Sequence, residues 1–164
     1  MRRARPEDAA AIAEVHVRTW QSAYEHIFGA ERLAELDVVP RRAAWERILA
    51  TTDEIVLVAE HEGAVVAFAS VGPSHSGGAD GELYAIYALP EAWGGGAGPV
   101  LMRAALGALR AEGFREAVLW VLEDNPRARR FYEREGWVLD GGGLREGEHL
   151  GVATAEVRYR IPLE

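Results

Sequence analysis

The sequence predicts an α/β domain with a mixed β-sheet, and two features of the 164-residue chain lead to this class. Two apolar, β-branched segments, 55–60 and 64–71, flank His61-Glu62-Gly63 and predict an antiparallel hairpin. A strand, a helix and a second strand then follow one another between residues 82 and 122, as in a βαβ crossover unit. A hairpin and a crossover unit in one sheet require both antiparallel and parallel strand pairs.

The N-terminal third is predicted to be helical after a short opening strand. Residues 6 to about 24 begin with proline and two acidic residues, and then place apolar side chains such as Ile12 and Val15 at helical spacing. Residues 30–50 contain two further helical pieces, and we expect a break between them near Pro40.

Glycine and proline mark the boundaries of the later elements. Residues 82–89 lie between Gly81 and Pro90 and predict a third central strand. Residues 99–112 predict a helix, with proline in its first turn, where the missing N–H costs nothing, and Gly113 after its end. The remaining elements are a buried strand at 117–122, a helix at 126–135 capped by Asp124 or Asn125, and two last strands at 137–139 and 156–161.

Composition indicates one domain, residues 1–164, because 49% of the residues are hydrophobic and the chain is long enough to bury a core. Without cysteine there is no disulfide, thiolate metal site or cysteine nucleophile. All 18 basic residues are arginine, which excludes a P-loop lysine and Schiff-base chemistry.

Charge and hydropathy limit the partners. A net charge of −8 argues against nucleic acid as a partner. We find neither a stretch approaching the roughly 20 apolar residues of a membrane span nor a signal-peptide core, and expect a cytoplasmic protein without membrane contact. The five histidines show no ligand spacing, so no metal site is expected.

A glycine-rich turn is the first candidate binding site. It joins a predicted strand to the N-terminus of a predicted helix, where free amide donors and the helix dipole favour a phosphate. Its spacing does not fit the dinucleotide-binding fingerprint, and a simple tight turn is the alternative interpretation. The turn consists of Gly94, Gly95, Gly96, Ala97 and Gly98.

A second motif begins about 30 residues after this turn, Asn125-x-x-Ala128-x-x-Phe131-Tyr132, and Gly136-Trp137 follows it. In this order and spacing, it and Trp93-x-x-Gly96-x-Gly98 resemble the GCN5-related N-acetyltransferases, the acetyl-CoA-dependent GNAT family. The resemblance covers essentially the whole chain. It implies a mixed, splayed sheet of about seven strands flanked by about four helices.

The resemblance also implies how acetyl-CoA binds. The main chain of Ile86, Tyr87 and Ala88 would pair with the pantetheine arm where two strands diverge. Asn125 would approach this arm, and Ala128 is small enough to let it pass. The amides of the glycine turn would hold the pyrophosphate. The family usually opens this turn with glutamine or arginine, and this chain has Trp93 there.

Two residues are candidates for acid–base catalysis. The resemblance gives Tyr132 the role of general acid toward the CoA thiolate, and a tyrosine with an ordinary pKa of about 10 carries its proton at pH 7. Glu82 would accept a proton from the amine, directly or through water. The alternatives are a packed aromatic side chain and a solvated carboxylate. The amine would attack directly, with the thioester carbonyl polarised by a backbone N–H of the strand.

The acceptor is expected to bind beside the first helix. Trp20 and Tyr24, with His16 one turn earlier, resemble the acceptor side of small-molecule members of the family, although i and i+4 residues also form core stripes. Tyr84 or Tyr87 would line the same pocket. Several carboxylates favour a cationic acceptor.

The sequence therefore predicts an N-acetyltransferase for a primary amine of a small molecule or peptide. A non-catalytic acyl-CoA-binding sensor is the alternative, and a phosphate binder that uses only the glycine turn is a third. By analogy with the family, an exposed final strand would allow a homodimer.

Overall fold

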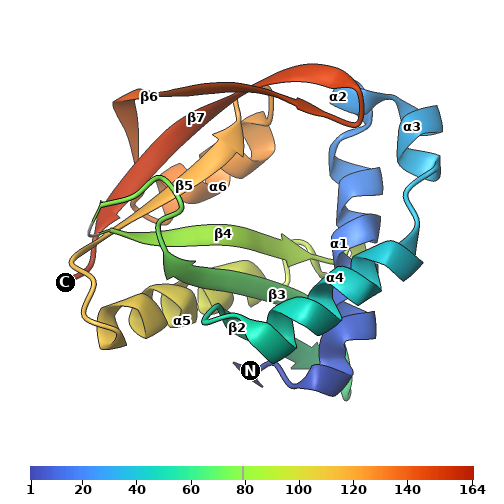
Figure 1. Ribbon diagram of the computed structural model, residues 1–164, viewed down its shortest axis with the longest axis horizontal. Coiled ribbons are helices and arrows are strands. Elements are labelled where there is room, and N and C mark those ends of the chain that lie inside the picture. Colours follow the sequence, from blue (N-terminus) through green and yellow to red (C-terminus); the bar gives the residue numbers. More distant parts are fainter. Residues whose placement is uncertain (79) are drawn as a thin grey trace.

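The computed structural model describes residues 1–78 and 80–164. Its strands are β1 (Arg2–Arg3), β2 (Ile55–His61), β3 (Ala64–Pro73), β4 (Gly81–Ala88), β5 (Glu116–Leu122), β6 (Val138–His149) and β7 (Val152–Pro162). In the described residues they form a seven-stranded sheet in the order β1-β2-β3-β4-β5-β7-β6 (Figure 1). Only the β4–β5 pair is parallel among these strands, which confirms the predicted mixed sheet.

The helices of the described residues are α1 (Ala9–Ala23), α2 (Glu25–Phe28), α3 (Ala30–Ala34), α4 (Val38–Thr51), α5 (Ala97–Ala111) and α6 (Pro126–Arg134). The two helical pieces predicted within residues 30–50 are present as α3 and α4, but the break between them lies at residues 35–37 and not at Pro40. Asp37 caps α4 by accepting a hydrogen bond from Val39 N at 2.9 Å, and Pro40 is the third residue of the helix. The first turn of a helix has no partner for its N–H groups, so proline is tolerated there.

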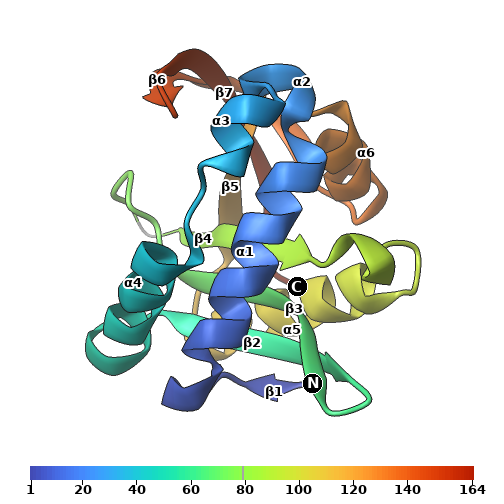
Figure 2. The ribbon, with the colours of Figure 1, turned by 90° about the vertical axis from the view of Figure 1, so that its right-hand side faces the viewer.

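Two apolar layers hold helices on opposite faces of the sheet. Buried side chains of α5, including Leu101 and Leu109, pack with residues of β2 to β5 and β7. On the other face, Ile12 and Val15 of α1 and Trp45 of α4 pack against β2 and β3. Figure 2 shows α1 and α4 in front of these strands. The sheet is therefore covered on both sides, as its central parallel pair requires.

The parallel pair is short, and the two strands then separate. β4 pairs with β5 only at Gly81, Glu82 and Leu83, although both strands continue beyond these residues. Figure 1 shows β5 turning away from β4 toward β7. This divergence confirms the splayed sheet and opens a space beside the second half of β4.

The C-terminal hairpin is longer than the sequence predicts. In place of short strands at 137–139 and 156–161, β6 has 12 residues and β7 has 11. Pairing is interrupted between Leu139 and Leu144, where the three consecutive glycines lie, and then continues to His149 opposite Val152. Glycine and charge in β6 hide the alternation that normally indicates a strand.

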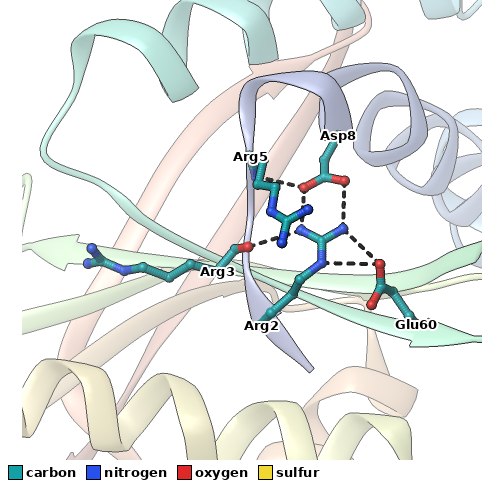
Figure 3. A network of polar contacts seen from close by, with 5 residues as sticks. All are labelled: Arg2, Arg3, Arg5, Asp8 and Glu60. Carbon is teal, nitrogen blue, oxygen red and sulfur yellow. Dashed lines mark hydrogen bonds and ion pairs between the residues drawn. The ribbon is translucent and has the colours of Figure 1, made fainter. Parts of the chain in front are cut away.

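An ion-pair network ties the N-terminus to the sheet (Figure 3). The Arg2 guanidinium donates two hydrogen bonds to Asp8, at 2.7 and 2.9 Å, and also binds Glu60 of β2. Asp8 accepts from the Arg5 backbone N–H at 2.6 Å, and Arg2 holds the pKa of this carboxyl below its ordinary value. These contacts fix the start of α1 against β2.

Candidate active site

A cavity of about 590 Å³ occupies the space where β4 and β5 diverge. This volume is typical of a small-molecule or cofactor site. Its lining comes from α1, β4, the glycine turn, β5, α6 and the β6–β7 hairpin. Almost every predicted site residue lies in this lining, although these residues come from distant parts of the chain.

The main chain of β4 turns polar groups toward this cleft. Leu89 N donates to Val66 O on β3 at 2.9 Å, so the alternation of an antiparallel ladder turns the N–H and C=O groups of Ala88 and Ile86 away from β3. The same alternation directs the main chain of Tyr87 toward β3 and leaves its side chain at the cleft. β5 does not pair at this level, so Ile86 offers an unpaired edge.

A β-bulge at Tyr84 explains the change of face along β4. Ser70 of β3 pairs with Ala85, and the next residue, Val71, pairs with Leu83. Tyr84 is the extra residue, so Leu83 and Ile86 both contact the α5 side of the core. A bulge bends its strand and re-aims the neighbouring side chains.

The glycine turn lies at one end of the cleft. Gly94, Gly96 and Gly98 line it, whereas Gly95 and Ala97 do not belong to its lining. Gly96 has φ 84° and occupies the N-cap position of α5, a left-handed conformation that glycine adopts without strain. The first amides of a 15-residue helix therefore begin at the cleft.

Three tyrosines gather around the middle of the cleft. Burial raises the pKa of Tyr132 above its ordinary value, and the neighbouring Tyr87 raises it further. Burial likewise raises the pKa values of Tyr87 and Tyr24, and Tyr24 is in turn influenced by Tyr87 and Tyr132. All three hydroxyls therefore carry their protons at neutral pH, and Tyr132 has a proton to donate.

Asn125 has a defined local role. It is buried, and its Oδ1 accepts a hydrogen bond from Ala128 N at 3.2 Å, so it is the N-cap of α6. Asn125 and Ala128 both line the cleft, so the cap of α6 forms part of the wall beside the tyrosines.

Glu82 lies near the start of β4, where the two strands are still paired. Its side chain is 6% exposed and accepts hydrogen bonds from Ser74 Oγ at 3.1 Å and His75 N at 2.8 Å. Tyr84 stacks on His75 and donates its hydroxyl proton to Pro73 O. Burial raises the pKa of Tyr84 to about 12, and Glu54 and Glu82 contribute to this shift. Glu82 and Tyr84 both line the cleft.

The aromatic residues of α1 divide between cleft and core. Trp20 and Tyr24 line the cleft and also pack with Phe28, whose ring is stacked on Trp20 at 5.7 Å. His16 is outside the cleft lining and contacts Phe68 and Tyr87. The positions of Trp20 and Tyr24 are therefore compatible with both interpretations, because each ring lines the cleft and also packs in the core.

Several side chains that line the cleft are not assigned to the site by the sequence analysis. Trp120 comes from β5, and Arg145, His149 and Glu156 come from the β6–β7 hairpin. Glu156 forms an ion pair with Arg145 and lies within hydrogen-bond distance of His149 Nε2, at 3.2 Å. The guanidinium of Arg145 lies 4.5 Å over the ring of Trp120. No local motif marks these residues, because only the pairing of β7 with β5 brings them to the cleft.

Among residues 1–78 and 80–164, no helix is long and apolar enough to cross a membrane. The same residues contain no group of three or more histidine or acidic side chains arranged to hold a metal ion.

Comparison with known proteins agrees with the fold and the motifs. The model of the acetyltransferase (GNAT) family matches residues 11–137. The uncharacterized N-acetyltransferase YuaI of Bacillus subtilis is 36% identical over 128 residues, which cover 77% of this chain and 73% of YuaI.

Two solved structures share the fold. A GNAT superfamily phosphinothricin acetyltransferase from Sinorhizobium meliloti, in complex with acetyl-CoA, gives a TM-score of 0.73 at 23% identity and covers 99% of this chain and 86% of its own. The PaiA N-acetyltransferase from Thermoplasma acidophilum, in complex with coenzyme A, gives a TM-score of 0.70 at 19% identity and covers 95% of both chains. With a family model that matches most of its length and a relative this similar, the chain belongs to the GNAT family of acetyltransferases.

Proposed function

We propose that the protein transfers an acetyl group from acetyl-CoA directly to a primary amine of a small molecule or peptide. The observation that carries this proposal is the cleft itself. It joins a free strand edge at Ile86, a glycine turn at the start of α5 and the protonated hydroxyl of Tyr132 in one cavity.

Acetyl-CoA fits the groups that line the cleft. The main chain of Ile86 offers one donor and one acceptor to an amide-containing arm such as pantetheine, and Ala128 leaves room beside it. The amides at Gly96 and Gly98 offer the pyrophosphate an anion site at a helix N-terminus. When bound, the thioester supplies the activated acetyl group.

The acid–base groups support direct transfer. An alkylamine with a pKa of about 10 must lose a proton before it attacks, and we assign this proton to Glu82, directly or through water. The C–S bond then breaks, and the departing thiolate takes a proton from the Tyr132 hydroxyl and leaves as CoA thiol. The second proton that the attacking nitrogen releases returns to the Tyr132 oxygen through water, which restores the hydroxyl. A backbone N–H of β4 near the bulge at Tyr84 would polarise the carbonyl.

The far end of the cleft favours a cationic acceptor. Glu82 and Glu156 both line the cleft, together with the rings of Trp20 and Trp120. Carboxylates attract an ammonium group, and indole faces bind cations with an energy of about 0.5–2 kcal/mol. Since Arg145 already neutralises part of the Glu156 charge, Glu82 is the stronger candidate to meet the amine.

Thiol release tests the function. The protein is incubated with acetyl-CoA and a panel of diamines, amino sugars, amino acids and short peptides, and free CoA is measured. We expect CoA release that requires both the enzyme and one class of amine, with an acetylated product of the matching mass. Tight binding of acetyl-CoA without release for any amine would favour the non-catalytic sensor over the enzyme.

Two further proposals concern the protein in its surroundings. A cytoplasmic location agrees with the family's co-substrate and remains a prediction. The predicted exposed final strand is wrong, because β7 lies inside the sheet between β5 and β6. The edge strand is β6, where Val138, Leu139 and Leu144 are exposed, and this edge supports the proposal of a homodimer. An edge strand with apolar side chains is a ready surface for pairing.

A further inference from the structure

Trp93 departs from the family pattern, and its environment suggests why the chain tolerates it. Its indole Nε1 donates to Ala88 O at 2.8 Å, which fixes the ring at the end of β4. The same carbonyl accepts a hydrogen bond from Thr19 Oγ1 at 2.9 Å. The ring therefore has a defined position at the entrance to the glycine turn, and it lines the cleft.

A cation from the opposite side of the cleft lies on this ring. The guanidinium carbon of Arg127 is 3.5 Å from the centre of the Trp93 ring system. Arg127 is the second residue of α6, after Pro126, and like Trp93 it lines the cleft. The contact therefore joins the β4–α5 side of the cleft to the β5–α6 side.

The start of α5 and the cleft face of α6 are close together. A Cβ atom added at Gly98 would lie 3.3 Å from the ring of Phe131. Phe131 is four residues after Arg127, so both project from the same face of α6. Arg127 and the glycine turn thus border one end of the same cavity.

Arg127 remains available to an anion. Its side chain is exposed at the cleft, and among residues 1–78 and 80–164 no carboxylate forms an ion pair with it. The partial desolvation of the Arg127 guanidinium lowers its pKa, and no nearby carboxylate raises the pKa again. An arginine is always charged in proteins and binds phosphate oxygens through two parallel N–H donors.

We propose that Arg127, held in place by the ring of Trp93, binds the pyrophosphate of acetyl-CoA at the glycine turn. It supplies from α6 the side-chain contact that the family usually supplies from position 93. The inference rests on the proposed use of acetyl-CoA. In this chain Arg127 would replace the pyrophosphate contact that a tryptophan at position 93 cannot make. Trp93 acts as a positioning residue, because it limits the conformations of the guanidinium before the ligand arrives.

Binding of CoA to three proteins tests this inference: the wild type, Arg127→Gln and Arg130→Gln. Arg130 is an exposed arginine of the same helix outside the cleft lining, so its variant removes one charge without touching the site. We expect Arg127→Gln to bind CoA about 10–100-fold more weakly, as for loss of a hydrogen bond to a charged group. Arg130→Gln should bind within about twofold of the wild type, since long-range effects are screened by salt.

Shortened ligands locate the contact. Dephospho-CoA keeps the pyrophosphate and lacks the 3′-phosphate, so Arg127→Gln should weaken it as much as it weakens CoA. Acetyl-pantetheine lacks both, and its reaction or binding should be the same in Arg127→Gln and the wild type. A loss that disappears with dephospho-CoA, or equal losses in both arginine variants, would overturn the assignment.

Trp93→Leu tests the positioning role. We expect it to weaken CoA binding by about 2–30-fold, as for loss of a cation–π contact. The double variant with Arg127→Gln should bind no more weakly than Arg127→Gln alone, because the two residues act through one contact. Fully additive losses would contradict this. A wild-type protein that binds CoA but acetylates no amine would remove the transferase proposal and leave the Arg127 assignment standing.

Discussion

The buried imidazole of His16 makes stability depend on pH, and its surroundings give the size of the effect. His16 Nδ1 accepts a hydrogen bond from Trp45 Nε1 at 3.3 Å, and the ring contacts Trp20, Phe68 and Tyr87. Burial, aided by the charge of nearby Arg41, lowers its pKa from 6.5 to about 3. The folded protein therefore keeps His16 neutral at pH values where the unfolded chain protonates it.

This difference in pKa determines whether stability rises or falls with pH. Above pH 6.5 both states are neutral and the full stability is present, and as the pH falls toward 3 protonation of the unfolded chain lowers the free energy of unfolding. Between pH 7.5 and 4.5 the loss from His16 is about 2.5 kcal/mol, because each pKa unit corresponds to about 1.4 kcal/mol. This is a large part of the roughly 5–15 kcal/mol that stabilises a typical domain.

Urea unfolding at both pH values checks this magnitude. His16→Asn retains an acceptor for Trp45 and does not titrate, so its stability should fall by about 2.5 kcal/mol less than that of the wild type between pH 7.5 and 4.5. Acidic groups such as Asp8 contribute equally to both proteins and cancel. His61→Asn, at an exposed position, is the matched control and should follow the wild type. Equal pH dependence in His16→Asn and the wild type would refute the argument.

Three further predictions concern the cleft. Tyr132→Phe removes one hydroxyl and should lower kcat about 10²–10⁴-fold with an unchanged Kd for acetyl-CoA, and unaltered turnover with a competent amine would exclude Tyr132 as the acid. Glu82→Gln should move the pH optimum upward toward the amine pKa of about 10, since the solution must then remove the proton; an unchanged pH–rate profile would count against Glu82. Gly72→Ala places a Cβ 2.6 Å from the Tyr84 hydroxyl and should cost about 1–3 kcal/mol in urea unfolding, so wild-type stability would contradict this packing.

Local sequence patterns predicted much of the fold, and they indicated the glycine turn and the Asn125 motif as parts of the site. The hairpin of β2 and β3, the helix α5 and a cap at Asp124 or Asn125 follow from turn residues, proline and hydrophobic spacing, which act over a few neighbours, and the structure shows that Asn125 is the cap. Such signals are strong because φ/ψ preferences and capping are decided locally. Proline fits both a break between helices and the first turn of a helix, so the sequence placed the break at Pro40 instead of at residues 35–37.

The acceptor end of the cleft depends on contacts between distant segments. Glu156 reaches the cavity because β7 pairs with β5 at Leu122, and the long β6 brings Arg145 and His149 to it. Likewise, no neighbour in sequence indicates that Arg127 lies on Trp93 or that His16 is buried beneath Tyr87. The sequence alone determines which residue types are available and, where turn and capping residues are clear, which elements form. Packing of the sheet and helices determines which of them meet, because strand pairing and burial join positions far apart in the sequence.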